Sequence, residues 1–270
     1  MRRIIVCADD YGLAPGVSEA IRALVAARRI NATSVMTLFP GLPEEAGRLR
    51  IAAQGSGASI GLHVTLSGRF APLRVAPLGG DRLSSMGRLL AGSFAGQVSR
   101  DRVRTEVEAQ FDAFETAFGM PPAHVDGHQH AHLLPVVREV VLDTTARRAP
   151  SALVRDCTQA PRARIGFDAK GRFISLLARG LAAAARARGL RVNTGFSGAY
   201  GLRQGGDFAA LFALFAGGLD EGGMMMVHPG HVDEILQSRD PVHAPREAEY
   251  RLLAGPTYGD LLAKAGVTLA

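Results

Sequence analysis

The chain has 270 residues, 47% of them hydrophobic and 21% charged, a composition typical of a globular protein with a substantial core. Its formal net charge is +6, but the basic residues are scattered through the sequence, which argues against a clustered nucleic-acid-binding surface. No apolar run reaches the roughly 18 residues of a membrane span, and the two cysteines, Cys7 and Cys157, make no disulfide framework. We therefore expect a cytoplasmic protein with neither a nucleic-acid nor a membrane partner.

Short apolar runs alternate with stretches of helical periodicity through most of the chain. The runs predicted to be strands are 3–8, 32–38, 58–64, 123–127, 151–156, 190–195, 223–228 and 266–269. The stretches predicted to be helices are 15–29, 43–53, 100–118, 134–148, 173–188, 207–217 and 245–264. This alternation predicts an α/β fold with a parallel sheet, either open and doubly wound or closed into a barrel.

The connecting segments indicate one domain. No linker is long and polar enough to separate two folded units, so we expect a single domain over residues 1–270. Residues 67–99 are rich in glycine, proline and serine and are too long for an ordinary connection. They are predicted to form an insertion or lid over a site.

Histidines and aspartates occur where four of the predicted strands end. In chain order the four groups are Asp9 and Asp10; His63; Asp126, His128, His130 and His132; and His228 and His231. In a parallel α/β fold the carboxyl ends of the strands share one face, and active sites form there. We therefore expect these groups to converge.

Histidines and carboxylates together are the donors of a catalytic metal site. Two imidazoles and one carboxylate leave coordination positions open for water, unlike the closed structural sites. A further carboxylate can act as a base on that water. This chemistry gives the adjacent acids Asp9 and Asp10 separate functions, provided that a backbone turn after the strand lets both side chains face one pocket.

The motifs "ADDYG", "GLHVTL", "HVDGHQHAH" and "VHPG" resemble those of the YdjC/ChbG-like carbohydrate deacetylases, which include the chitooligosaccharide (chitin-disaccharide) deacetylases. The resemblance extends from about residue 3 to residue 255 and keeps the motifs in the family's order. It implies an irregular, TIM-barrel-like (β/α) barrel with mostly parallel strands. It also implies an enzyme that removes acetyl groups from N-acetylated sugars with a divalent metal ion.

The resemblance further implies roles for individual residues. Asp9 would be the general base, and His228 would be the acid that protonates the departing nitrogen, with His132 as the alternative acid. The residues expected to bind one divalent metal ion, zinc or magnesium, are Asp10, His63 and His128. The residues expected to contact the sugar are His132, Phe70, Tyr200 and Arg155.

Two alternative functions stay open at this point. Another metal-dependent hydrolase, such as a phosphoesterase, would need ligands for two metal ions about 3.5–4 Å apart, and His130 and His132 leave that possibility open. A non-catalytic carbohydrate-binding protein would have no need of a base such as Asp9 beside the metal. The sequence leaves the acetylated sugar unspecified, and a monomer and a homodimer are both open.

Overall fold

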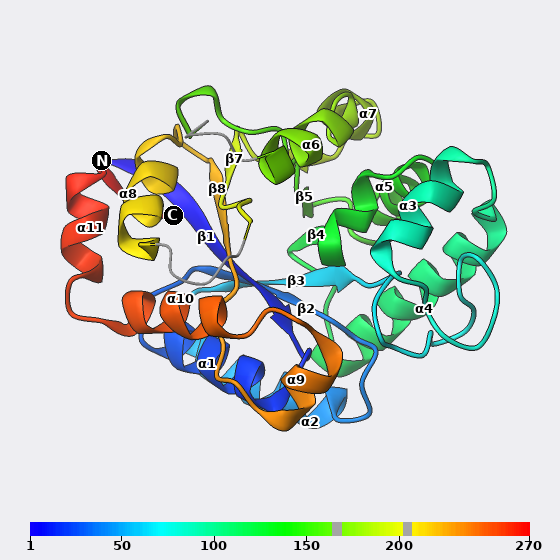
Figure 1. Cartoon of the computed structure of the whole chain (residues 1–270), viewed down its shortest axis with the longest axis horizontal. Coiled ribbons are helices and arrows are strands. Elements are labelled where there is room, and N and C mark those ends of the chain that lie inside the picture. Colours follow the sequence, from blue (N-terminus) through cyan, green and yellow to red (C-terminus); the bar gives the residue numbers. More distant parts are fainter. Residues whose placement is uncertain (164–168, 202–206) are drawn as a thin grey trace.

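The computed structural model describes residues 1–163, 169–201 and 207–270. Parallel strands form a sheet that curls into a half-barrel, with helices around its outside (Figure 1). The strands are β1 (Arg2–Tyr11), β2 (Ala32–Val35), β3 (Ser59–Val64), β4 (His124–Gly127), β5 (Leu153–Val154), β6 (Arg191–Val192), β7 (Phe196–Ser197), β8 (Met224–Val227) and β9 (Val267–Leu269). They pair in the order β6-β5-β4-β3-β2-β1-β8-β7, and β9 pairs with the start of β1. The predicted α/β fold with mostly parallel strands is confirmed.

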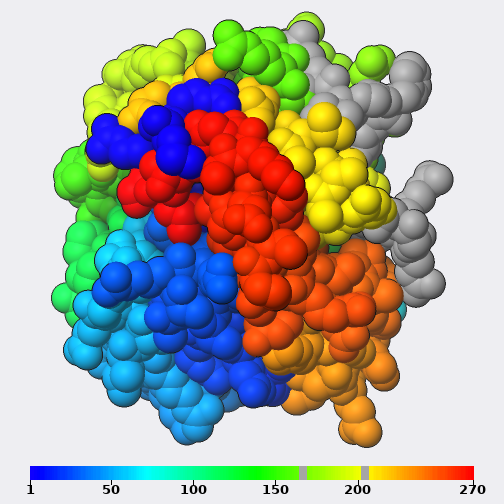
Figure 2. Space-filling view, turned by 90° about the vertical axis from the view of Figure 1, so that its left-hand side faces the viewer, coloured from blue at the N-terminus to red at the C-terminus, as the bar shows by residue number. Residues whose placement is uncertain are grey.

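β1 is the central strand of this sheet. On one side it pairs with β2 over Cys7 to Tyr11 and, nearer its start, with β9 over Arg2 to Ile4; on the other side it pairs with β8 over Ile5 to Ala8. Because β9 is close to the end of the chain, the first and last segments lie against each other, as the blue and red atoms in Figure 2 show. The first predicted strand therefore lies in the middle of the core, between segments that are far apart in the sequence.

The two sides of the sheet approach each other beyond β5. The backbone amide of Phe196 donates to the carbonyl of Thr158 at 3.2 Å, and the amide of Ala160 donates to the carbonyl of Phe196 at 2.9 Å. β7, which contains Phe196, lies between the predicted strand 190–195 and the predicted helix 207–217. The described residues thus form a curled half-barrel, and complete closure in the manner of a TIM barrel is not confirmed.

The helices begin and end at residues whose chemistry suits those positions. They are α1 (Pro15–Ala26), α2 (Leu42–Gln54), α3 (Met86–Phe94), α4 (Arg100–Phe118), α5 (Val137–Arg148), α6 (Ala169–Leu177), α7 (Leu181–Arg186), α8 (Phe208–Gly217), α9 (Glu234–Arg239), α10 (Ala244–Ala254) and α11 (Tyr258–Lys264). The side chain of Ser99 caps α4 by accepting a hydrogen bond from the amide of Arg102. Gly119 ends α4 in the left-handed region, with φ of 70°.

Several predicted helices differ from the observed ones. The predicted helix 173–188 is two helices, α6 and α7, separated near Gly180, and 245–264 is likewise α10 and α11, separated at Gly255 and Pro256. Proline lacks the amide hydrogen that a continuous helix would need there. α3 lies within the predicted insertion 67–99, and α9 lies between the predicted strand 223–228 and the predicted helix 245–264.

The segment 67–99 contains α3 and packs on the main hydrophobic core through Phe70, Leu83 and Leu89. Its function as a lid, and the organisation of the chain as a single domain, stay predictions. Along the part of the chain that the structure describes, no helix combines the length and apolar character needed to cross a membrane.

Candidate metal centre

A backbone irregularity lets two neighbouring acids face one cavity. β1 continues through Asp9 and Asp10 to Tyr11, beyond the predicted end of the strand at residue 8. Its pairing with β2 shifts register between Ala8 and Tyr11, and Asp10 has φ of 70°, in a region that aspartate adopts more readily than most residues. Because this bulge breaks the alternation of a regular strand, both carboxylates line the same cavity.

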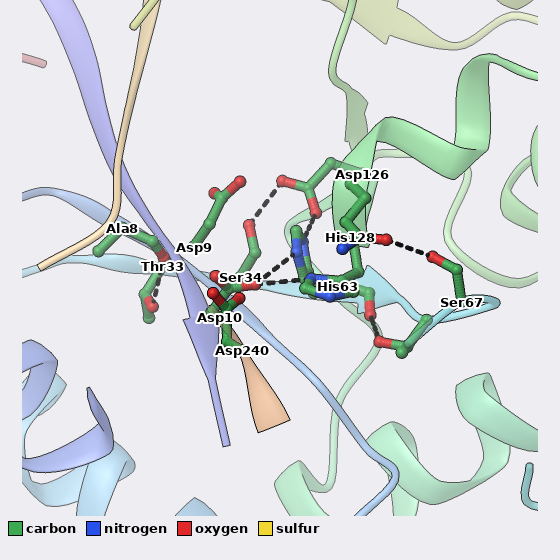
Figure 3. Close-up of polar contacts among 12 residues, drawn as sticks. Ala8, Asp9, Asp10, Thr33, Ser34, His63, Ser67, Asp126, His128 and Asp240 are labelled. Carbon is green, nitrogen blue, oxygen red and sulfur yellow. Dashed lines mark hydrogen bonds and ion pairs between the residues drawn. The ribbon is translucent and has the colours of Figure 1, made fainter. Parts of the chain in front are cut away.

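Asp10 meets two histidines from neighbouring strands (Figure 3). His63, in β3, places Nε2 3.3 Å from Asp10 Oδ1, and His128, directly after β4, donates from Nδ1 to the same oxygen at 2.8 Å. One potential ligand atom from each of these three buried side chains lies within 4.8 Å of the others. The structure therefore brings together the three residues that the resemblance implied as metal ligands.

The segment after β4 separates its three histidines. Gln129 and His130 have φ of 52° and 61°, so the chain turns sharply instead of staying extended. His132 Nε2 donates to the backbone carbonyl of Arg155 at 3.1 Å. Within the described residues, neither His130 nor His132 belongs to a group of potential metal ligands.

Asp126 fixes the ring of His63. Nδ1 of His63 donates to Asp126 Oδ1 at 2.6 Å, which leaves Nε2 facing Asp10. The Ser34 hydroxyl donates to the other oxygen of Asp126, also at 2.6 Å. Burial alone would lower the pKa of His63, but Asp126 and Asp10 outweigh it and raise this pKa to about 10. Before a metal binds, His63 is therefore protonated at neutral pH.

A second group of potential ligands lies behind the first: Cys7, His124 and Asp126. Ser34 connects them, with its Oγ 3.3 Å from Cys7 Sγ and 3.0 Å from His124 Nε2. Burial raises the pKa of Cys7 and lowers that of His124 to about 4. The thiol and the imidazole are therefore neutral at neutral pH, and both contact the Ser34 hydroxyl that donates to Asp126.

Arg155 lies between Asp9 and Asp126 and contacts both. Its two terminal nitrogens each lie 2.6 Å from a carboxylate oxygen of Asp9, and Nη2 also lies 2.6 Å from Asp126 Oδ2. Burial would lower the pKa of Arg155, but Asp126 and Asp9 raise it well above its ordinary value. Although a sugar contact was expected for it, Arg155 is completely buried beneath the site and is not among the described residues that line the cavity.

A cavity of about 340 Å³ opens above these side chains. Tyr200 and His228 line it, together with the ligand group and Asp9. Of the other residues expected to contact the sugar, Phe70 and His132 are buried and are not among the described lining residues. The ring of Phe70 instead packs edge-on against that of His128, with centroids 6.3 Å apart.

α10 contributes two buried groups that the sequence analysis did not identify. Arg246 donates to Asp10 Oδ2 at 2.7 Å; burial would raise the pKa of Asp10, but Arg246 and the two histidines lower it well below its ordinary value. Glu249 accepts hydrogen bonds from the hydroxyl of Tyr200, at 2.6 Å, and from the backbone amide of His228. Burial raises the pKa of Glu249 to about 7. Neither residue lies in a recognised motif, and arginine is too common in this sequence to be a signal.

A parallel half-barrel with an Asp-His-His group at the carboxyl ends of its strands is the arrangement of a metal-dependent hydrolase. The model of the YdjC-like protein family matches residues 3–264, and the chain belongs to this family. The family predicted from the four motifs is thus confirmed.

Individual relatives agree with this assignment. A chitooligosaccharide deacetylase from Serratia marcescens is 28% identical over 281 residues, with 98% of this chain and 96% of the relative covered. One from Yersinia enterocolitica is 27% identical over 280 residues with the same coverage. The crystal structure of a putative cellobiose-phosphate cleavage protein from Enterococcus faecalis V583 is 20% identical and superposes with a TM-score of 0.78, covering 100% of this chain and 97% of the other. This structural similarity shows the shared fold.

Proposed function

We propose that the protein removes the acetyl group from an N-acetylated sugar by metal-dependent hydrolysis. The observation that carries the proposal is the group of Asp10, His63 and His128 at the bottom of a cavity, with a further carboxylate, Asp9, beside it. The enzyme class, a carbohydrate deacetylase, agrees with the family and with the names of both full-length relatives.

The donor set fits one divalent metal ion. It offers two imidazoles and one carboxylate, all buried, and the adjoining cavity leaves room for water and substrate. Two nitrogen donors favour zinc or a similar transition metal, whereas magnesium prefers oxygen donors. A metal bound there would polarise the acetyl carbonyl and lower the pKa of a water molecule.

Asp9 is positioned to take a proton from the attacking water. Both of its oxygens accept from Arg155, but a carboxylate has about four acceptor positions, so lone pairs remain for the water. Asp9 lines the cavity, whereas Arg155 holds it from below. We therefore assign Asp9 as the base and Arg155 as the residue that orients it.

His228 is our choice for the group that passes a proton to the leaving nitrogen. Burial lowers the pKa of His228 to about 4, so the imidazole is neutral before turnover. The proton that it delivers is then the one that Asp9 has taken from water, and the products are acetate and a free amine. His132, the alternative acid, is held by the carbonyl of Arg155 and is not among the described lining residues.

The test is an acetate-release assay over a panel of N-acetylated sugars, with the protein stripped of metal and then reloaded with zinc or magnesium. We expect release only after reloading. Asp9→Asn should retain the metal and lose about 10²–10⁴-fold in kcat, whereas Asp10→Asn should also bind metal more weakly.

Two results would change these assignments. If Asp9→Asn lost the metal and Asp10→Asn kept it, the roles of the two acids would be reversed. If p-nitrophenyl phosphate were hydrolysed and no acetylated sugar were, the phosphoesterase alternative would replace the deacetylase. The cytoplasmic location and the oligomeric state stay predictions from the sequence.

A further inference from the structure

Two helices place apolar side chains around the mouth of the cavity. Met86 and Leu90 of α3 line it, and the four-residue spacing continues on the same side of the helix to Phe94, which is 63% exposed. On α6 the lining residues are Lys170, Phe173, Ile174 and Leu177, of which the last three are apolar. An apolar surface therefore begins inside the cavity and extends to the outside of the protein.

Two apolar side chains of α6 are strongly exposed. Phe173 is 46% exposed, and its neighbour on α6, Leu176, is 52% exposed. A contiguous exposed apolar surface next to a cavity typically marks a place where a ligand or partner binds. A single exposed leucine would need no explanation, but here two helices contribute to one surface.

Three polar side chains that line the cavity have hydrogen-bond partners within the protein. The Tyr200 hydroxyl donates to Glu249, and Gln129 Oε1 accepts from Ser67 at 2.9 Å. One oxygen of Asp240 accepts from the backbone amide of Val242 at 2.6 Å. A second sugar ring would bring several hydroxyl groups that need hydrogen-bond partners, and the atoms named here already have partners within the protein.

We propose that the substrate is an N-acylated amino sugar that carries an apolar chain or ring, and that this apolar group binds between α3 and α6. The inference rests on the proposed function, because it assigns the amide to the metal centre. The apolar group can be attached in two ways, as the aglycone of the sugar or as a longer N-acyl chain. Both present the same chemistry to Leu90 and Phe173.

The experiment compares kcat/KM for methyl and octyl glycosides of N-acetylglucosamine with that for diacetylchitobiose, all below the micelle concentration. Each buried methylene is worth a factor of about four, so burial of two or three should favour the octyl over the methyl glycoside about 15- to 60-fold. N-octanoylglucosamine, assayed by amine release, tests attachment through the acyl group.

Substitutions on α3 and α6 test whether these two helices cause the preference for the octyl glycoside. Phe173→Gln and Leu90→Gln should reduce the octyl-to-methyl ratio several-fold, because each puts an amide in the apolar surface. Ile51→Gln on α2 is the matched control; Ile51 is 71% exposed and is not among the described lining residues, so the ratio should stay unchanged. The inference is wrong if neither octyl compound exceeds its short-chain counterpart, or if the Phe173 and Leu90 variants keep the parent ratio.

A binding measurement separates this inference from the proposed function. Calorimetry with the Asp9→Asn protein measures the affinity for both glycosides without turnover. If the Asp9→Asn protein binds the octyl glycoside more tightly, but the unsubstituted protein releases acetate from no substrate, the proposed deacetylase activity is refuted and the apolar site is retained. Equal affinities would refute the apolar site whatever the activity.

Discussion

The floor and the mouth of the cavity are built on different physical principles. On the floor, Asp9, Asp10, His63 and Asp126 are buried and each is held by a charged or hydrogen-bonded partner at a defined atom. At the mouth, Leu90 and other apolar side chains make non-directional contacts. Hydrogen bonds and ion pairs fix positions to fractions of an ångström, whereas apolar surface selects for shape and area. Changes to the floor should therefore alter the rate, and changes to the mouth should alter which substrate is used.

The largest effect should come from removing a ligand. His63→Ala removes one of the two imidazoles and leaves only Asp10 and His128 of the proposed three ligands. We expect loss of tight metal binding and a fall in kcat/KM of at least about 10³-fold, within the range for loss of a catalytic group. Metal content by mass spectrometry and acetate release are the measurements. Full metal occupancy with normal turnover would remove His63 from the centre.

A smaller effect should follow from a change to Asp126, which holds the ring of His63. Asp126→Asn keeps the shape of the side chain but cannot hold a charged Arg155 and a His63 N–H equally well. Loss of such a supporting carboxylate typically costs about 10–100-fold in metal affinity or activity. Titration with zinc measures the affinity, and Thr158→Val, at a partly buried hydroxyl away from the ligands, is the control. An unchanged affinity would mean that Asp126 does not orient His63.

Metal binding should depend on pH. The pKa of His63 is raised to about 10, so this imidazole carries a proton at neutral pH that the metal must displace. The affinity should accordingly rise with pH, by up to about tenfold per pH unit below that pKa. Calorimetry in two buffers of different ionisation enthalpy should show about one proton released per metal. No release near pH 7 would contradict the protonation of His63.

An effect on stability, and not on the rate, should come from Glu249, which accepts hydrogen bonds from Tyr200 and the backbone amide of His228. Its pKa is about 7 in the folded protein, against an ordinary value of 4.5, so the folded state holds this proton more tightly than the unfolded state. Stability should therefore fall as pH rises from about 4.5 to about 7, by at most about 3 kcal/mol, and should not change further above that range. Glu249→Gln resembles the protonated form and should lose this dependence. Thermal unfolding from pH 4.5 to 8 compares the two proteins, and parallel curves would refute the assignment.

The parts of the site that were predictable from the sequence are those that lie in local motifs. The convergence of Asp10, His63 and His128 was predicted because each directly follows or ends an apolar strand and parallel strands share one carboxyl end, and the family resemblance then implied these three as the ligands. The contacts of Arg155 with Asp9 and of Arg246 with Asp10 were not predicted. These two arginines contact Asp9 and Asp10 across 146 and 236 residues of sequence, and nothing local distinguishes them from the other arginines.

Elements without a strong pattern were missed for a similar reason. α3 lies in a segment rich in glycine and serine, and its apolar residues face the cavity as well as the core, so the segment shows no simple two-sided pattern. β7 has two residues, too few for any periodicity to appear. The bulge at Asp10 was expected only as a turn, because its φ of 70° depends on the neighbouring strands.

The central position of β1 also governs how the protein can be synthesised. Its partner β2 follows within about thirty residues, but β8 and β9 are the last strands of the chain. While the ribosome adds the intervening residues, one edge of this apolar strand has no partner, and open strand edges promote aggregation. Nascent chains that end before Met224 should therefore depend on chaperones, and Asp9 and Asp10 acquire their final geometry only after β8 has been synthesised.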